Sequence, residues 1–376
     1  MRRLSLASWL LLFLSLIQSY GQARNPSPTP TPRPDEQEPV RIFTEEVRLT
    51  VAATDRFGHY DPSLELADVL VLEDGEQQQI RSIQQLPASV LLLLDVGNQL
   101  GLKDTKTTSQ ISSYVVAALH QGDRIAVMQF AERPQLLRDW TTDKDAVEKV
   151  LRTKLLSGKS SRLGDAIVAA ANQFKDTTPG TRHIVLITDG VEAPGGKSTL
   201  AQSLKQLNSI QASVHIISYT VLARTALENR NKTVSKGDGV QRDGNPASNP
   251  VANGDPTLPP GTTRTPTFKI GSIDTDFAMR KKLKEYERAT RESEKALTAM
   301  AEESGGQIML PKSSEDLLAE AGEIARDIGS QCIVTYRPKR PLAEARPGEY
   351  RRVEVASRRV GLYLRTRRGY VVPGGP

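Results

Sequence analysis

Residues 90–95 read VLLLLD, and residues 183–190 read HIVLITDG. The first is a continuous apolar run that ends on Asp95 and lacks the polar face of a half-exposed strand, and the second is a strand-like stretch that ends at Asp189. Such runs are typical of central strands in a parallel sheet that is covered on both sides. They predict that Asp95 and Asp189 lie at the carboxyl edge of a buried sheet. Carboxylates there suit a hard cation such as Mg²⁺, but each could simply end its strand and cap the next helix.

Strand-like and helical patterns alternate around these two runs. Further strands are expected over 123–130, 213–220 and 307–310, and helices over 107–120, 143–156, 163–174, 198–210, 277–304 and 313–328. Asp143 is expected near the N-cap of its helix. The alternation predicts an α/β domain over residues 88–329 with a doubly wound, mainly parallel sheet.

Alternating β patterns flank this domain on both sides. The N-terminal segment, residues 40–87, reads as a small antiparallel unit with turns at 55–58 and 73–76. The C-terminal segment, residues 330–376, contains three strand-like stretches, at 332–336, 350–355 and 360–366. Each segment is too small to be stable alone. We therefore expect the two segments to pair into one small β-sandwich beside the α/β domain.

The N-terminus has the pattern of an export signal. Arg2 and Arg3 precede an apolar run, and small residues stand three and one positions before a break after Ala23. We expect a signal peptide over residues 1–23 and a secreted, periplasmic or cell-envelope location. No integral membrane span is expected after cleavage, although a retained signal acting as an anchor is the alternative. Cys332 is the only cysteine, so no internal disulfide can form, and its thiol is expected in the core.

Two segments have a composition that favours disorder. Residues 24–39 are rich in proline and predict an extended linker. Residues 224–276 combine Gly, Pro, Asn, Thr and Lys with almost no apolar periodicity. Because such a segment cannot repay the entropy of ordering itself, it predicts a disordered insertion in the α/β domain.

The positive charge of the chain is concentrated near its C-terminus. The formal net charge is +6, or +4 once Arg2 and Arg3 are removed, which is too mild to imply a nucleic-acid partner. Residues 337–368 nevertheless hold eleven Lys and Arg against three Glu. We interpret these charges as the solvated faces of β-strands, and the alternative is a site for a polyanion or a membrane surface.

Four stretches in order resemble a von Willebrand factor type A (VWA) domain. They are DRIAVMQF (123–130), TDKDAVEKVL (142–151), GKSSRLGDAIVAAANQF (158–174) and HIVLITDG (183–190). The resemblance runs from about residue 90 to 328. The flanks, 66–83, 330–338 and 350–370, look like the margins of a bacterial family of exported VWFA-related proteins. The resemblance implies protein binding or adhesion at the cell envelope rather than catalysis.

The resemblance also implies a site for Mg²⁺ or Mn²⁺. In VWA domains a metal-ion-dependent adhesion site combines an Asp-x-Ser-x-Ser motif, a threonine and an aspartate before glycine. Asp95 and Asp189 match the two aspartates, and Ser161 matches the threonine as a hydroxyl. Gly97 and Gln99 replace both motif serines. The implied site is therefore degenerate and binds metal weakly or not at all, unless water or a neighbouring amide side chain supplies the missing ligands.

Other functions have weaker support in the sequence. Residues 190–198, GVEAPGGKS, lie between a strand and a helix like a phosphate-binding loop, but five residues instead of four separate Gly190 from Gly196. A hydrolase that uses Lys197 is one alternative to a binding protein. A metal-independent scaffold of the envelope is another. The four histidines have no spacing suited to zinc. We expect a binding protein with a protein partner, and no enzyme.

Overall fold

The computed structural model describes residues 46–61, 63–98, 105–175, 180–222, 224–225, 277–346 and 348–372. All of them belong to one compact unit, Glu45–Pro376. The signal peptide predicted over 1–23 and the linker over 24–39 lie outside the described residues. The insertion predicted over 224–276 also lies outside them, apart from Arg224 and Thr225.

A mainly parallel sheet forms the centre of the α/β domain. Its described strands are β5 (Ala88–Asp95), β6 (Arg124–Phe130), β7 (Pro134–Thr141), β8 (Thr181–Thr188), β9 (Ser213–Ser218) and β10 (Ile308–Met309). They follow the order β10-β9-β8-β5-β6-β7. Neighbours from β10 to β6 are parallel, and β7 is antiparallel to β6. All residues of the central strand β5 are buried, which confirms the predicted sheet.

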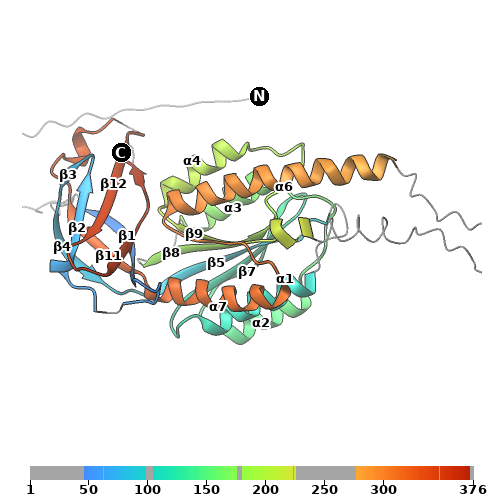
Figure 1. Ribbon diagram of the computed structural model, residues 1–376, viewed down its shortest axis with the longest axis horizontal. Helices are drawn as coiled ribbons and strands as arrows, with labels where there is room; N and C mark the ends of the chain where they lie inside the picture. Colours follow the sequence, from blue (N-terminus) through green and yellow to red (C-terminus); the bar gives the residue numbers. More distant parts are fainter. Residues whose placement is uncertain are drawn as a thin grey trace, which may run out of the picture. The chain divides into compact units, whose positions relative to one another are not determined.

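Two layers of helices cover the sheet. The described helices are α1 (Thr105–Ala118), α2 (Lys144–Thr153), α3 (Leu163–Gln173), α4 (Leu200–Ile210), α6 (Phe277–Ser304) and α7 (Ser314–Ser330). α1, α2 and α7 pack on one face, and α3, α4 and α6 on the other (Figure 1). Because side chains alternate along a strand, Leu92 of β5 enters the first layer and Leu93 the second. Asp143 caps α2 as predicted, accepting from the Ala146 amide at 3.0 Å.

Strand β7 is absent from the sequence prediction. Its residues show mixed burial instead of a clean alternation, because the strand lies at the edge of the sheet. The register with β6 also shifts twice, between Ile125 and Val127 and between Val127 and Met128. An irregular edge strand of this kind gives no period-two pattern that the sequence analysis can detect.

The two ends of the chain combine into two further sheets. The strands are β1 (Val47–Asp55), β2 (Val69–Glu73), β3 (Glu76–Gln77), β4 (Gln79–Gln84), β11 (Cys332–Arg337), β12 (Tyr350–Ser357), β13 (Leu362–Arg365) and β14 (Gly369–Val371). Their orders are β13-β1-β11-β4 and β14-β12-β2-β3. One apolar cluster joins both sheets, with Leu49, Val51 and Tyr336 from the first and Val71 and Tyr370 from the second. The predicted sandwich of N- and C-terminal segments is confirmed (Figure 1).

The expected N-terminal unit does not form by itself. β1 pairs with β11 and β13, while β2 pairs with β12 and with the short β3. The N-terminal strands are thus divided between the two sheets and are held by C-terminal partners. The prediction of a local antiparallel unit is wrong for β1, because its hydrogen-bonding partners come from the far end of the sequence.

Arginines tie the sandwich to the α/β domain. Arg365 donates to Asp327 of α7 at 2.5 Å and to the Gly306 carbonyl at 2.8 Å, and Arg368 pairs with Glu302 of α6 at 2.7 Å. Gly306 is required for a close approach, since a Cβ there would lie 1.9 Å from the Val214 carbonyl oxygen of β9.

Candidate functional site

Asp95 lies at the carboxyl end of β5 and is completely buried. Its Oδ1 accepts a hydrogen bond from the Ser161 hydroxyl at 2.6 Å and another from the Gly97 amide at 3.0 Å. Its Oδ2 accepts from the Thr188 hydroxyl at 2.6 Å. Two of the three predicted site residues are thus in direct contact, and Thr188, at the end of β8, is a partner that the sequence analysis missed.

Asp189 follows directly after β8 and is held by helix α6. Its Oδ1 accepts from the Val191 amide at 3.1 Å, and its Oδ2 accepts a very short hydrogen bond from the Tyr286 hydroxyl. Ser293, two turns along α6, donates to the Asp189 carbonyl at 2.6 Å. Burial, followed by the charge of Asp189, raises the pKa of Tyr286 far above its ordinary value. The tyrosine therefore remains a protonated donor to Asp189.

The first motif position cannot hold a serine in this backbone. A Cβ on Gly97 would lie 2.2 Å from the Ser161 Oγ and 2.6 Å from the Ser160 carbonyl. The Gly97 segment pairs closely with the following loop, where the Asn98 amide donates to the Gly158 carbonyl at 3.0 Å. The close packing of these two segments therefore explains why glycine replaces the motif serine at position 97. The second position, Gln99, lies outside the described residues.

The donor set around Asp95 and Asp189 does not fit a magnesium ion. Mg²⁺ requires near-octahedral oxygen ligands at about 2.0–2.1 Å. The four oxygens of the two carboxylates instead accept hydrogen bonds from protein hydroxyls and amides, and both aspartates are at most 2% exposed. Within the described ranges no group of three or more His, Cys, Asp or Glu side chains has a metal-binding arrangement. The arrangement is a closed hydrogen-bond network at the position of the predicted site.

The glycine-rich loop also has an internal partner. The Lys197 amide donates to Asp165 Oδ1 at 2.9 Å, and the Ser198 amide donates to the same oxygen at 2.8 Å. These are the amides that a phosphate would have to reach. Nearby, Glu192 accepts from the Gly164 amide at 3.1 Å, and burial raises the pKa of this carboxyl. The carboxylate of Asp165 thus holds the loop in place of a ligand.

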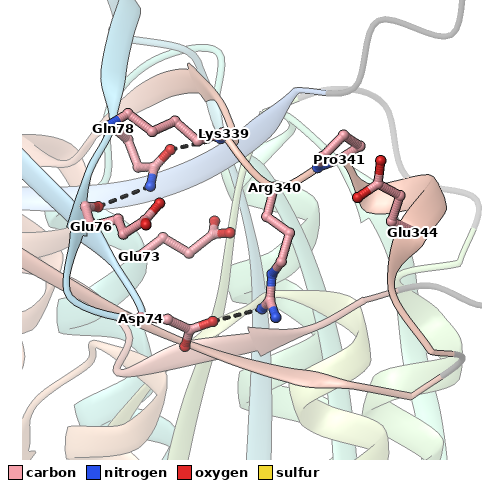
Figure 2. A pocket seen from close by; sticks show the side chains of 8 residues that line it. All are labelled: Glu73, Asp74, Glu76, Gln78, Lys339, Arg340, Pro341 and Glu344. Atoms are coloured by element: carbon pink, nitrogen blue, oxygen red, sulfur yellow. Dashed lines mark hydrogen bonds and ion pairs between the residues drawn. The ribbon is translucent and has the colours of Figure 1, made fainter.

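A separate pocket of about 450 Å³ lies on the sandwich. Figure 2 shows the side chains that line it. Its lining is Glu73, Asp74, Glu76, Gln78, Lys339, Arg340, Pro341 and Glu344. Arg340 pairs with Asp74 at 2.7 Å, and the Lys339 amide donates to Gln78 at 2.9 Å. Because these polar side chains already pair with one another, few hydrogen-bonding groups remain for a ligand. We therefore do not take this pocket as a candidate site.

The remaining sequence candidates are structural. Cys332 is 8% exposed in β11, and burial raises the pKa of its thiol to about 11, as expected of a core cysteine. His183 and His215 lie inside β8 and β9 and are completely buried, with 3.2 Å between Nδ1 of the first ring and Nε2 of the second. The two rings form a buried pair, tilted by 34° relative to each other, that is joined through these nitrogens.

The sequence comparison decides the family of the α/β domain. Residues 90–192, which contain Asp95, Ser161 and Asp189, match the von Willebrand factor type A domain. The chain carries a VWA domain. A search of curated proteins found no match to the chain. The helices in the described part of the VWA domain and of the sandwich lack the length and apolar character needed to cross a membrane.

Three of the solved structures with a distant likeness to this chain are the following. One is an aerotolerance-related membrane protein from Bacteroides fragilis, with 16% identity, TM-score 0.36, and coverage of 63% of this chain and 98% of that chain. A second is a von Willebrand factor type A protein from Catenulispora acidiphila, with 9% identity, TM-score 0.41, and coverage of 88% and 73%. The third is proximal thread matrix protein 1 from the mussel byssus with a zinc-occupied metal-ion-dependent adhesion site, with 15% identity, TM-score 0.33, and coverage of 36% and 39%. With values this low, the family assignment rests on the match over 90–192.

Proposed function

We propose that this chain is an exported binding protein whose VWA domain engages a protein partner without a metal ion. The observation that carries the proposal is the hydrogen-bonded state of Asp95 and Asp189, whose carboxylates accept from Ser161, Thr188 and Tyr286. In metal-dependent adhesion the partner supplies a ligand to a bound ion. In this proposal no such ion is bound at Asp95 and Asp189. Binding then depends on the shape and chemistry of the loops at this edge.

The loops at the carboxyl edge offer a contact surface. Leu156 is 67% exposed, and it lies in the loop that pairs with the Gly97 segment through Gly158. Residues 194–197 of the glycine-rich loop are also exposed. An exposed large apolar residue beside exposed polar loops is a suitable centre for a small protein interface. The export pattern over residues 1–23 supports placing this interface outside the cytoplasm.

The proposal is tested by capturing envelope proteins on the immobilised chain, in Mg²⁺ and again in EDTA. We expect the same partner to be retained under both conditions. Leu156→Asp should abolish capture, since a carboxylate at the centre of an interface is costly to desolvate. Tyr114→Asp is the matched control, because Tyr114 is also a large exposed side chain (50% exposed) but lies on α1 and not in these loops. This substitution should leave capture unchanged. Capture that requires Mg²⁺ would contradict the proposal.

The two alternative functions give different outcomes in simple assays. For a structural scaffold of the envelope, no soluble partner is retained in either buffer. For a hydrolase that uses Lys197, nucleotide turnover is detectable and is lost in Lys197→Ala. The hydrogen bonds from the Lys197 and Ser198 amides to Asp165 argue against the hydrolase, because a phosphate would have to displace a carboxylate.

A further inference from the structure

A wide cavity of about 760 Å³, largely open to solvent, lies where the C-terminal strands meet the end of α6. Its charged lining consists of Arg352, Arg365, Arg367 and Arg368 together with Glu302 and Glu354. Four positive charges against two negative ones leave an excess of two positive charges. Tyr350 and Leu364 contribute apolar surface to the same cavity. Its volume is in the range of small-molecule sites in proteins.

Three of the four arginines are paired with acids. Arg352 contacts Glu354 at 3.0 Å, Arg365 contacts Asp327 at 2.5 Å, and Arg368 contacts Glu302 at 2.7 Å. Each of these guanidinium groups therefore has a carboxylate that offsets its charge.

Arg367 differs from the other three. It is only 5% exposed, and its side chain makes no hydrogen bond or ion pair with any residue that the structure describes. Burial lowers the pKa of Arg367 to about 10; Tyr350 opposes this shift, and the charge of Arg182 adds slightly to it. The group is still protonated at neutral pH, so a cation is buried here beside a second cation and without a carboxylate.

A buried charge without a counter-charge is costly, and proteins retain one mainly where a ligand supplies the partner. The guanidinium group presents donors in a planar fork that matches an oxyanion. We propose that the cavity binds a small molecule with a phosphate or carboxylate group, which pairs with Arg367 while its apolar part lies against Tyr350 and Leu364. This site is separate from the aspartate network, and it accounts for part of the basic C-terminal segment.

The test is a calorimetric titration of the chain with phenyl phosphate, benzoate, inorganic phosphate and phenol. We expect binding of at least one of the two aromatic anions, weaker binding of inorganic phosphate, and no binding of neutral phenol. The ratio of the affinities for phenyl phosphate and benzoate distinguishes a phosphate ligand from a carboxylate ligand.

Variants assign the binding to Arg367. Arg367→Met should lower the affinity at least tenfold, and Arg367→Lys should lower it less. Arg358→Met should leave the affinity unchanged, because Arg358 is exposed and does not line the cavity. Without ligand, Arg367→Met should melt no lower than the parent chain, since it removes an uncompensated buried charge. The proposal is overturned if neither aromatic anion binds, or if Arg367→Met or Arg367→Lys binds as tightly as the parent chain.

Discussion

Glu73→Ala is expected to lower the free energy of unfolding by about 3–5 kcal/mol, the range for breaking a buried ion pair by removing one partner. Glu73 is 3% exposed and accepts from Arg351 at 2.9 Å, from Tyr336 at 2.5 Å and from Tyr370 at 2.9 Å. Arg351 is completely buried. Without the carboxylate, a buried guanidinium loses its main counter-charge and two tyrosine hydroxyls lose their acceptor.

Chemical denaturation followed by circular dichroism measures this effect. The matched control is Glu76→Ala in the next strand, because Glu76 is exposed and its loss should change the free energy of unfolding by no more than about 0.5 kcal/mol. Equal effects of the two substitutions would show that the Glu73 network does not hold the two sheets together.

Acid is expected to destabilise the protein through the buried pair His183 and His215. Burial, together with the charge of Arg365, lowers the pKa of His215 to about 3, and burial with the charge of His215 lowers the pKa of His183 well below its usual value. Asp327 Oδ2 lies 3.3 Å from His215 Nδ1. The carboxylate does not keep the ring protonated, because its charge is offset by its ion pair with Arg365. The pair connects β8 and β9 to the junction with the sandwich.

The direction of the pH effect follows from proton uptake. An unfolded histidine titrates near about 6.5, so below that pH the unfolded chain binds protons that the folded chain excludes. Stability is fully present above about pH 6.5 and is lost as the pH falls toward the folded value. Between neutral pH and pH 4.5, the exclusion of a proton from His215 alone lowers the free energy of unfolding by about 3 kcal/mol.

Denaturation curves between pH 7 and 4.5 check this expectation. His215→Gln should give a shallower dependence of the unfolding free energy on pH than the parent chain. His59→Gln, at a ring that is 78% exposed, should leave the slope unchanged. If the parent chain and His215→Gln lose stability in parallel, the buried pair is not the source of the acid sensitivity.

The central sheet and its edge aspartates were predictable because their signals are local. A fully apolar run such as VLLLLD specifies a strand covered on both sides, and the aspartate that ends it falls at the carboxyl edge. The alternation of helices and strands then gives the fold. The place of Ser161 in the site could be predicted only from the resemblance to VWA domains, because nothing in the neighbouring sequence indicates a contact with Asp95.

The chemistry around the aspartates depends on contacts that the sequence pattern does not encode. Tyr286 has the helical spacing of a core residue on α6, and this spacing does not reveal that its hydroxyl reaches Asp189. Position 97 reads as a lost ligand, whereas the structure gives the steric reason for the glycine. Likewise Arg351 and Arg367 read as solvated charges of a basic segment, and that interpretation is wrong for these two because both are buried.

The central claim is that hydrogen bonds within the protein take the place of a metal ion at Asp95 and Asp189. The most direct test is calorimetric titration of the purified chain with Mg²⁺ and Mn²⁺, with Asp189→Ala alongside. The account predicts no binding heat from either ion in either protein. Binding in the micromolar to low millimolar range that disappears in Asp189→Ala would contradict it, and would mean that the ion displaces Tyr286 and restores a metal-dependent adhesion site.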